Sequence, residues 1–242
     1  MLLLAAALAL SACAASQTGV GSADRSRYTS VAIVPDINDR LVTVYWANAL
    51  SSPSSSEARL GWNAAKGAGQ ISAEILSHTG ASVTVSSDPT GSAARSAEVA
   101  VILRQTPLNA LAQSYNPGQD ILLSGVSVAG AAAAGGMATV SIRGERGFQP
   151  RSVLHVKGGG VRGRSQLDLC AVGITPYLVD PKTGETLKKG RPLTGIEKIS
   201  LGASGRSWQS FSATERATIL AYCQSALRRA ISQAFVELDI VD

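Results

Sequence analysis

Short apolar runs alternate with polar segments along the chain, and the length and composition of each run predict a strand or a helix. Five short runs rich in β-branched residues predict strands, and Pro35 ends the first of them. These runs are 31–34, 41–48, 81–85, 99–103 and 152–156. A longer run, 166–180, is apolar on both faces of a two-residue alternation, which is typical of a central strand. The turn 180–185 (DPKTGE) then predicts a hairpin.

Two segments have the spacing of amphipathic helices. In the first, Ser54 and Glu57 have capping-box spacing, and apolar residues follow every three or four positions as far as Gly80. In the second, Ser212 and Glu215 repeat the capping box before an apolar stripe that includes Cys223. The pattern therefore predicts an α/β or α+β fold, a layered sandwich of a mixed sheet with an amphipathic helix near the start and a C-terminal helix.

Residues 121–142 (ILLSGVSVAGAAAAGGMATVSI) carry no charge. A membrane span is one interpretation. The four glycines would weaken a lone membrane helix, and the two ends of the segment resemble strands. We expect two strands joined by a small-residue connection.

The chain begins with the apolar run MLLLAAALALSAC, which is too short to span a bilayer and is typical of an export signal. Its ending, Leu10-Ser11-Ala12-Cys13, resembles the lipobox of bacterial lipoproteins, which implies cleavage before Cys13 and lipidation of that residue. Ala14 in place of Asp favours the outer membrane, facing the periplasm, by the sorting rule of that family. We expect a signal peptide at 1–12, a lipidated flexible tether at 13–27 and a single globular domain at 28–242.

Charge is concentrated in one segment. The chain has a net charge of +5, 45% apolar residues and 16% charged residues, which is the composition of a globular protein. Residues 143–191 hold ten cations against four acids. A basic face there would suit an anionic lipid, a cell-wall polymer or an acidic protein, and a solvated sheet rim is the alternative. The candidate contact residues are Lys157, Arg162, Arg164, Lys188, Lys189 and Arg191. Aromatic residues are not interleaved with this charge, so nucleic acid is not an expected partner.

Few residues suggest catalysis or a cofactor. The glycine-rich stretch 155–165 (HVKGGGVRGRS) fits G-x-G-x-x-G, but it leads into a strand and not into the helix that a dinucleotide site needs. His78 and His155 have no neighbouring ligand at metal-site spacing, so we expect neither a metal nor a cofactor.

The two remaining cysteines, Cys170 and Cys223, are a candidate disulfide in an oxidising compartment. Two buried thiols are the alternative. A Cys–His pair with His155 and a carboxylate pair of Asp36 and Asp39 are the remaining catalytic candidates, although acids alone specify no reaction.

The fragments VAIVPDIND, GASVTV, DILLSGVSV and PYLVDPKTGETL occur in an order that resembles the CsgG-like envelope lipoproteins, over about residues 28–190. The resemblance implies an α/β sandwich that acts by protein–protein contact. We therefore expect a lipid-anchored, non-enzymatic adaptor or assembly factor with an envelope partner. A subunit of an oligomeric outer-membrane secretion ring and an envelope hydrolase are the alternatives.

Overall fold

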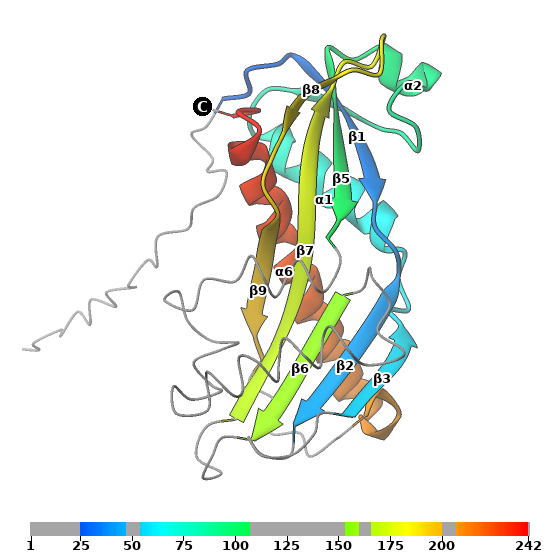
Figure 1. Ribbon diagram of the computed structural model, residues 1–242, viewed down its shortest axis with the longest axis vertical. Coiled ribbons are helices and arrows are strands. Elements are labelled where there is room, and N and C mark those ends of the chain that lie inside the picture. Colours follow the sequence, from blue (N-terminus) through cyan, green and yellow to red (C-terminus); the bar gives the residue numbers. More distant parts are fainter. Residues whose placement is uncertain (1–24, 47–53, 107–152, 160–165, 200–206, 242) are drawn as a thin grey trace, which may run out of the picture.

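The computed structural model describes residues 25–46, 54–106, 153–159, 166–199 and 207–241 (Figure 1). The strands in these ranges are β1 (Ser30–Asp36), β2 (Arg40–Trp46), β3 (Ser54–Arg59), β4 (Ser82–Val85), β5 (Val99–Gln105), β6 (Val153–Gly159), β7 (Gln166–Val179), β8 (Thr186–Lys189) and β9 (Leu193–Lys198). The helices are α1 (Ala64–Ser77), the short α2 (Ser92–Arg95), the 3-10 turn η2 (Trp208–Ser210) and α6 (Ala213–Glu237). The described residues therefore form the mixed sheet with an early and a C-terminal helix that the sequence predicts.

All nine strands belong to one mixed sheet, in which β7 is the longest and most connected strand. The first half of β7 pairs with β6, and its second half pairs with β5. The sheet then continues from β6 to β2 and β3, and from β5 to β1 and β4. On its other edge β7 pairs with β8 and β9. The predicted central position of 166–180 is thus confirmed.

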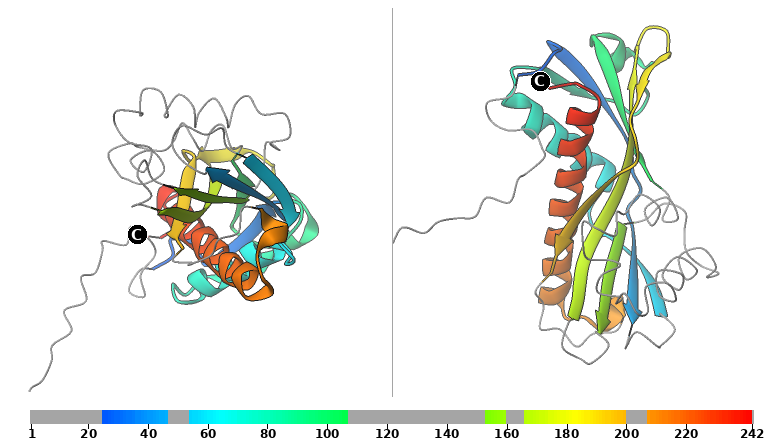
Figure 2. Two further views of the ribbon diagram at one scale, coloured as in Figure 1. Left: turned by 90° about the horizontal axis from the view of Figure 1, so that it is seen from below. Right: turned by 60° about the vertical axis from the view of Figure 1, so that its left-hand side comes forward.

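Helices α1 and α6 lie on the same side of the sheet, and α6 runs along the length of β7 and β9 (Figure 2). Alternation along β1 places Val31 and Ile33 in the large core beneath these helices. Ala32 points to the opposite face, where it packs in a smaller cluster with Ala94 of α2. Because β1 is buried on both faces, its sequence is a continuous apolar run rather than an alternating one.

The C-terminal helix begins as the sequence predicts. The Ser212 side chain accepts a hydrogen bond from the Glu215 backbone N–H, and the Glu215 carboxylate accepts one from the Ser212 N–H. These two bonds satisfy donors that the first turn of a helix leaves without a partner. The stripe residues Ile219, Cys223, Leu227 and Ile231 are fully buried.

The predicted capping box at Ser54 and Glu57 is wrong. Both residues lie in β3, which pairs antiparallel with β2, and Glu57 forms an ion pair with Arg40 on that neighbouring strand. Helix α1 begins later, where the Asn63 side chain accepts a hydrogen bond from the Lys66 backbone N–H. Cross-strand pairing outweighed a local capping signal here, because β3 pairs with β2 along all six of its residues and the ladder satisfies the backbone groups that point to β2. The predictions for residues 1–24 and for 121–142 concern residues outside the described ranges.

Candidate functional site

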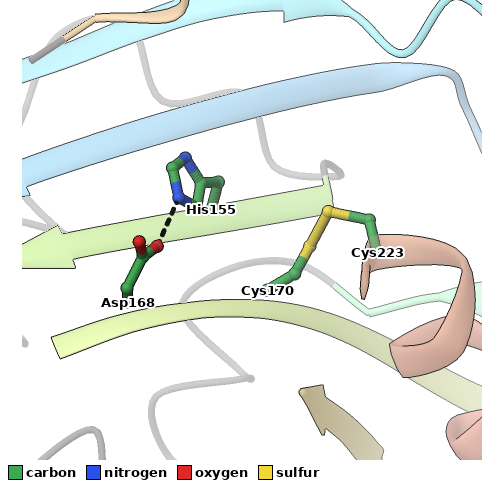
Figure 3. Close-up of a disulfide and its surroundings, with 4 residues drawn as sticks. All are labelled: His155, Asp168, Cys170 and Cys223. Carbon is green, nitrogen blue, oxygen red and sulfur yellow. Dashed lines mark hydrogen bonds and ion pairs between the residues drawn. A yellow bond between two sulfur atoms is a disulfide. The ribbon is translucent and has the colours of Figure 1, made fainter. Parts of the chain in front are cut away.

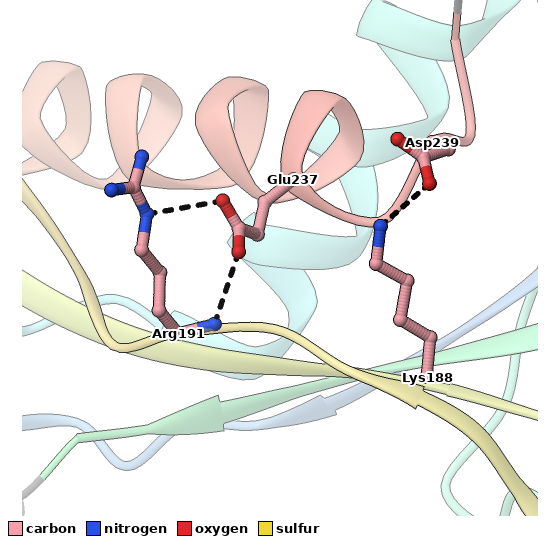
Figure 4. Close-up of polar contacts among 4 residues, drawn as sticks. All are labelled: Lys188, Arg191, Glu237 and Asp239. Atoms are coloured by element: carbon pink, nitrogen blue, oxygen red, sulfur yellow. Dashed lines mark hydrogen bonds and ion pairs between the residues drawn. The ribbon is translucent and has the colours of Figure 1, made fainter.

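Three of the six candidate contact residues lie together, at the end of the domain where β7 turns into β8. Lys188 donates from Nζ to Oδ2 of Asp239 at 2.6 Å. Arg191 donates from its backbone N and from Nε to the carboxylate of Glu237, at 3.3 and 3.1 Å (Figure 4). These contacts join β8 and the segment after it to the last residue of α6 and the residues that follow it. They are solvent-exposed ion pairs, so each contributes at most about 1 kcal/mol to stability.

Lys189 lies at the same end, and its ammonium group lies over the aromatic ring of Tyr177. Its Nζ is 5.7 Å from the centroid of Tyr177, and the guanidinium of Arg104 is 5.1 Å from the same centroid. Arg104 also donates from Nε to Asp36 at 3.1 Å. Asp36, one of the two candidate catalytic carboxylates, is therefore part of a surface ion pair.

Lys157 does not belong to this group. Its backbone pairs with Asp168 near the start of β7, whereas Lys189 pairs with Tyr177 near the end of that strand. Nine residues of an extended strand separate these two positions, or about 30 Å. Arg162, Arg164 and Cys13 lie outside the described residues. The candidate residues that the structure describes thus fall in two places rather than on one patch.

The two cysteines form a disulfide that links β7 to α6. The Cys170 and Cys223 sulfurs are 1.99 Å apart, the Cα atoms are 5.1 Å apart, and both side chains are fully buried (Figure 3). The candidate bridge is therefore present, and the alternative of two free thiols is wrong. A Cys–His nucleophile is also excluded for these two residues, because neither sulfur carries a thiol.

A buried polar pair lies beside the disulfide. His155 of β6 and Asp168 of β7 are joined by a 2.8 Å contact between Nε2 and Oδ1, and their side chains are 0% and 5% exposed. The ring of Phe211 meets the imidazole edge-on, with centroids 5.6 Å apart. Nδ1 of His155 has no hydrogen-bond partner in the described part of the chain. These surroundings fit donation from Nε2 to the carboxylate, because a proton on Nδ1 would be a buried donor without an acceptor among the described residues.

Sequence reasoning did not find this pair. His155 and Asp168 are 13 residues apart, and they meet only because β6 and β7 pair in a particular register. Alternation along the strands was the available signal for this pair. His155 lies two residues from Val153 and Asp168 lies two residues from Cys170, so both polar side chains occur at core-facing positions. His78, the other histidine, is the exposed C-cap residue of α1.

The described carboxyl groups with a lowered pKa lie on exposed turns. The side-chain hydrogen bond and the charge of Lys188 hold the pKa of Asp239 below its ordinary value. The pKa of Asp180 is also lowered, chiefly because its side chain accepts from the backbone N–H of Lys182 in the β7–β8 turn. These groups are fully solvated and stabilise turns, so they do not resemble a catalytic acid.

Among the described residues, no three His, Cys, Asp or Glu side chains form a group suited to a metal ion. None of the helices in the described ranges combines the length and apolar character needed to cross a bilayer. Comparisons with protein-family models, with curated proteins and with solved structures found no match. The resemblance to CsgG-like lipoproteins therefore stays a prediction.

Proposed function

We propose that the protein is a lipid-anchored cell-envelope protein that acts as a non-enzymatic adaptor or assembly factor through protein–protein contact. The observation that carries the proposal is the buried disulfide between Cys170 and Cys223. Disulfides of this structural kind form in oxidising compartments and are rare in a reducing cytosol. Export to such a compartment agrees with the apolar leader and lipobox that end at Cys13.

The surroundings of the titratable groups favour an adaptor over a hydrolase. The one described histidine–carboxylate contact, between His155 and Asp168, is closed to solvent on both sides. A general base must come within hydrogen-bond reach of its substrate, which a fully buried imidazole does not do. Some exposed charged residues of the described chain form surface pairs, such as Lys188–Asp239 and Arg191–Glu237. Surfaces of that kind suit recognition of another macromolecule.

The lipid anchor is tested by replacing the modified residue. We expect Cys13→Ala to abolish both the cleavage of the leader and the lipid mass on the N-terminal peptide, measured by mass spectrometry of protein from membranes. The double variant Cys170→Ala with Cys223→Ala is the matched control, since it removes two cysteines and should keep the lipid. Unchanged lipid mass in Cys13→Ala would disprove the anchor.

The contact surface is tested by reversing charge at two of its candidate residues, in the sequence between β6 and β7. We expect Arg162→Glu with Arg164→Glu to weaken a photo-crosslink from the protein to its envelope partner, with no change in melting temperature. The control is Lys66→Glu, an exposed cation on α1 outside the basic segment. A lower melting temperature in the double variant would instead assign these two residues a structural role, and an unchanged crosslink would remove them from the interface.

A further inference from the structure

Ser26 and Arg27, which the sequence predicts at the end of a flexible tether, are instead fixed to one end of the domain. The backbone N–H of Arg27 donates to the carbonyl oxygen of Ile240 at 2.8 Å, and that of Ser26 donates to Thr79 at 3.2 Å. Ser26 also forms an antiparallel bridge with Val241. The start of β1, the end of α6 and the β7–β8 hairpin all lie at this end (Figures 1 and 2). We call it the attachment end.

The length of the tether limits how the domain can face a bilayer. Twelve residues lead from Cys13 to Arg25, and a fully extended chain of that length spans about 40 Å. Helix α6 runs from η2, at the opposite end, to the attachment end, and its 25 residues are about 37 Å long. For η2 to touch the membrane while the attachment end points away, the tether would have to be almost fully extended. That extension carries a large entropic cost, which disfavours the inverted orientation.

The side chains at the attachment end suit a lipid interface. Two of the three large apolar residues that stand out as exposed in the described ranges belong to elements that end here, namely Leu187 at 53% on β8 and Val236 at 45% in the last turn of α6. Lys188 and Lys189 follow Leu187 directly, and Lys182 is exposed in the adjoining turn. Lysine stems lie along apolar surface while the ammonium groups reach phosphate. Lys188 donates to Asp239 and Lys189 lies over Tyr177, so the exposed Lys182 is placed to reach headgroup phosphate beside Leu187.

We propose that the attachment end is the surface through which the domain meets the bilayer that holds its anchor, with Leu187 of the β7–β8 hairpin at the headgroup level. This inference rests on the lipid anchor of the proposed function. It leaves η2 and the neighbouring ends of β6 and β2 directed away from the membrane. The end of β6 and the start of β7 would then face a partner tens of ångströms from the bilayer, and not the lipid headgroups.

The experiment uses the full-length lipidated protein in vesicles of phosphatidylethanolamine and phosphatidylglycerol. Single-cysteine variants Leu187→Cys and Gln209→Cys are labelled with an environment-sensitive thiol dye. Cys170 and Cys223 are bridged and buried, so they do not react with the dye. Gln209 of η2 is exposed and marks the opposite end. Quenching by a nitroxide on the lipid headgroup is then compared between the two positions.

We expect several-fold stronger quenching at position 187 than at position 209. Equal quenching, or stronger quenching at position 209, overturns the inference while the anchor stands. Absence of lipid on Cys13 in the same preparation overturns the proposed function and this inference together, and mass spectrometry distinguishes that outcome. Replacement of Leu187 by Asp gives an independent readout. We expect it to lower quenching of a dye at position 182 in Lys182→Cys, and unchanged quenching there would exclude contact by Leu187.

Discussion

The closest approach between helix and sheet occurs at Gly195, and it makes a sharp prediction. A Cβ atom built on Gly195 of β9 would lie 1.8 Å from the carbonyl oxygen of Ala226 and 2.8 Å from the backbone N of Ala230, both in α6. Gly195→Ala would therefore force strand and helix apart by more than an ångström. Backbone atoms cannot rotate away, and the disulfide at Cys223, one turn earlier, holds α6 against β7.

The expected cost follows from this geometry. Adding one methyl group to a packed core costs about 1–3 kcal/mol when side chains can adjust. Here no side-chain rotation relieves the contact, so we expect Gly195→Ala to lower the free energy of unfolding by at least about 3 kcal/mol, a large part of the 5–15 kcal/mol of a typical domain. The assay is urea unfolding followed by circular dichroism, with the disulfide intact.

Two further variants test whether the clash with α6, rather than the change from glycine to alanine in itself, lowers the free energy of unfolding. Gly91→Ala is the matched control, because its nearest neighbours would be 3.3 Å away or more and its φ is not positive, and we expect a change below about 1 kcal/mol. Ala226→Gly should not rescue Gly195→Ala, since the atom in conflict is a carbonyl oxygen that glycine also carries. Recovery of stability in that double variant, or a cost below about 1 kcal/mol for Gly195→Ala alone, would refute the argument.

Two other predictions concern polar contacts. His155→Leu should lower the free energy of unfolding by about 3 kcal/mol, because it removes a hydrogen bond from the buried carboxylate of Asp168, and the double variant with Asp168→Leu should recover much of that loss in urea unfolding. Lys188→Met should raise the pKa of Asp239 toward its ordinary value of 3.8, measured by NMR titration of the carboxyl group. Because the pKa of Asp239 is lower in the folded state than in the unfolded state, its ionised carboxylate stabilises the fold at pH values above 3.8. The wild-type protein loses this contribution as the pH falls from 3.8 through the folded-state pKa of Asp239. An unchanged Asp239 titration in Lys188→Met would show that Lys188 does not act on it.

Local patterns predicted most of the elements that the structure describes. The β-branched runs at 31–34 and 99–103 are strands, and the capping box at Ser212 does begin α6. The same kind of signal failed at Ser54, where pairing with β2 takes the segment into a strand. Propensity acts between neighbours in sequence, and a partner strand supplied by another part of the chain can outweigh it.

The candidate site was less predictable than the elements. Composition located an excess of positive charge in 143–191, but β7 places Lys157 and Lys189 about 30 Å apart, near its opposite ends. The pairing of Lys188 with Asp239 and of Arg191 with Glu237 depends on the position of α6 beside β8. No property of the basic segment itself reveals that the C-terminal residues supply its carboxylates.

The leader with its lipobox stays a prediction. By itself the sequence determined the class of fold and the burial of Cys223 on a helical stripe. Each of these depends on residues within one short window, where periodicity of 2 or 3.6 residues decides which side chains share a face. Only the tertiary structure decided that Cys223 meets Cys170, that His155 meets Asp168, and that Ser26 meets Val241. These contacts link distant segments, and their formation depends on sheet register and helix docking, which no single window contains.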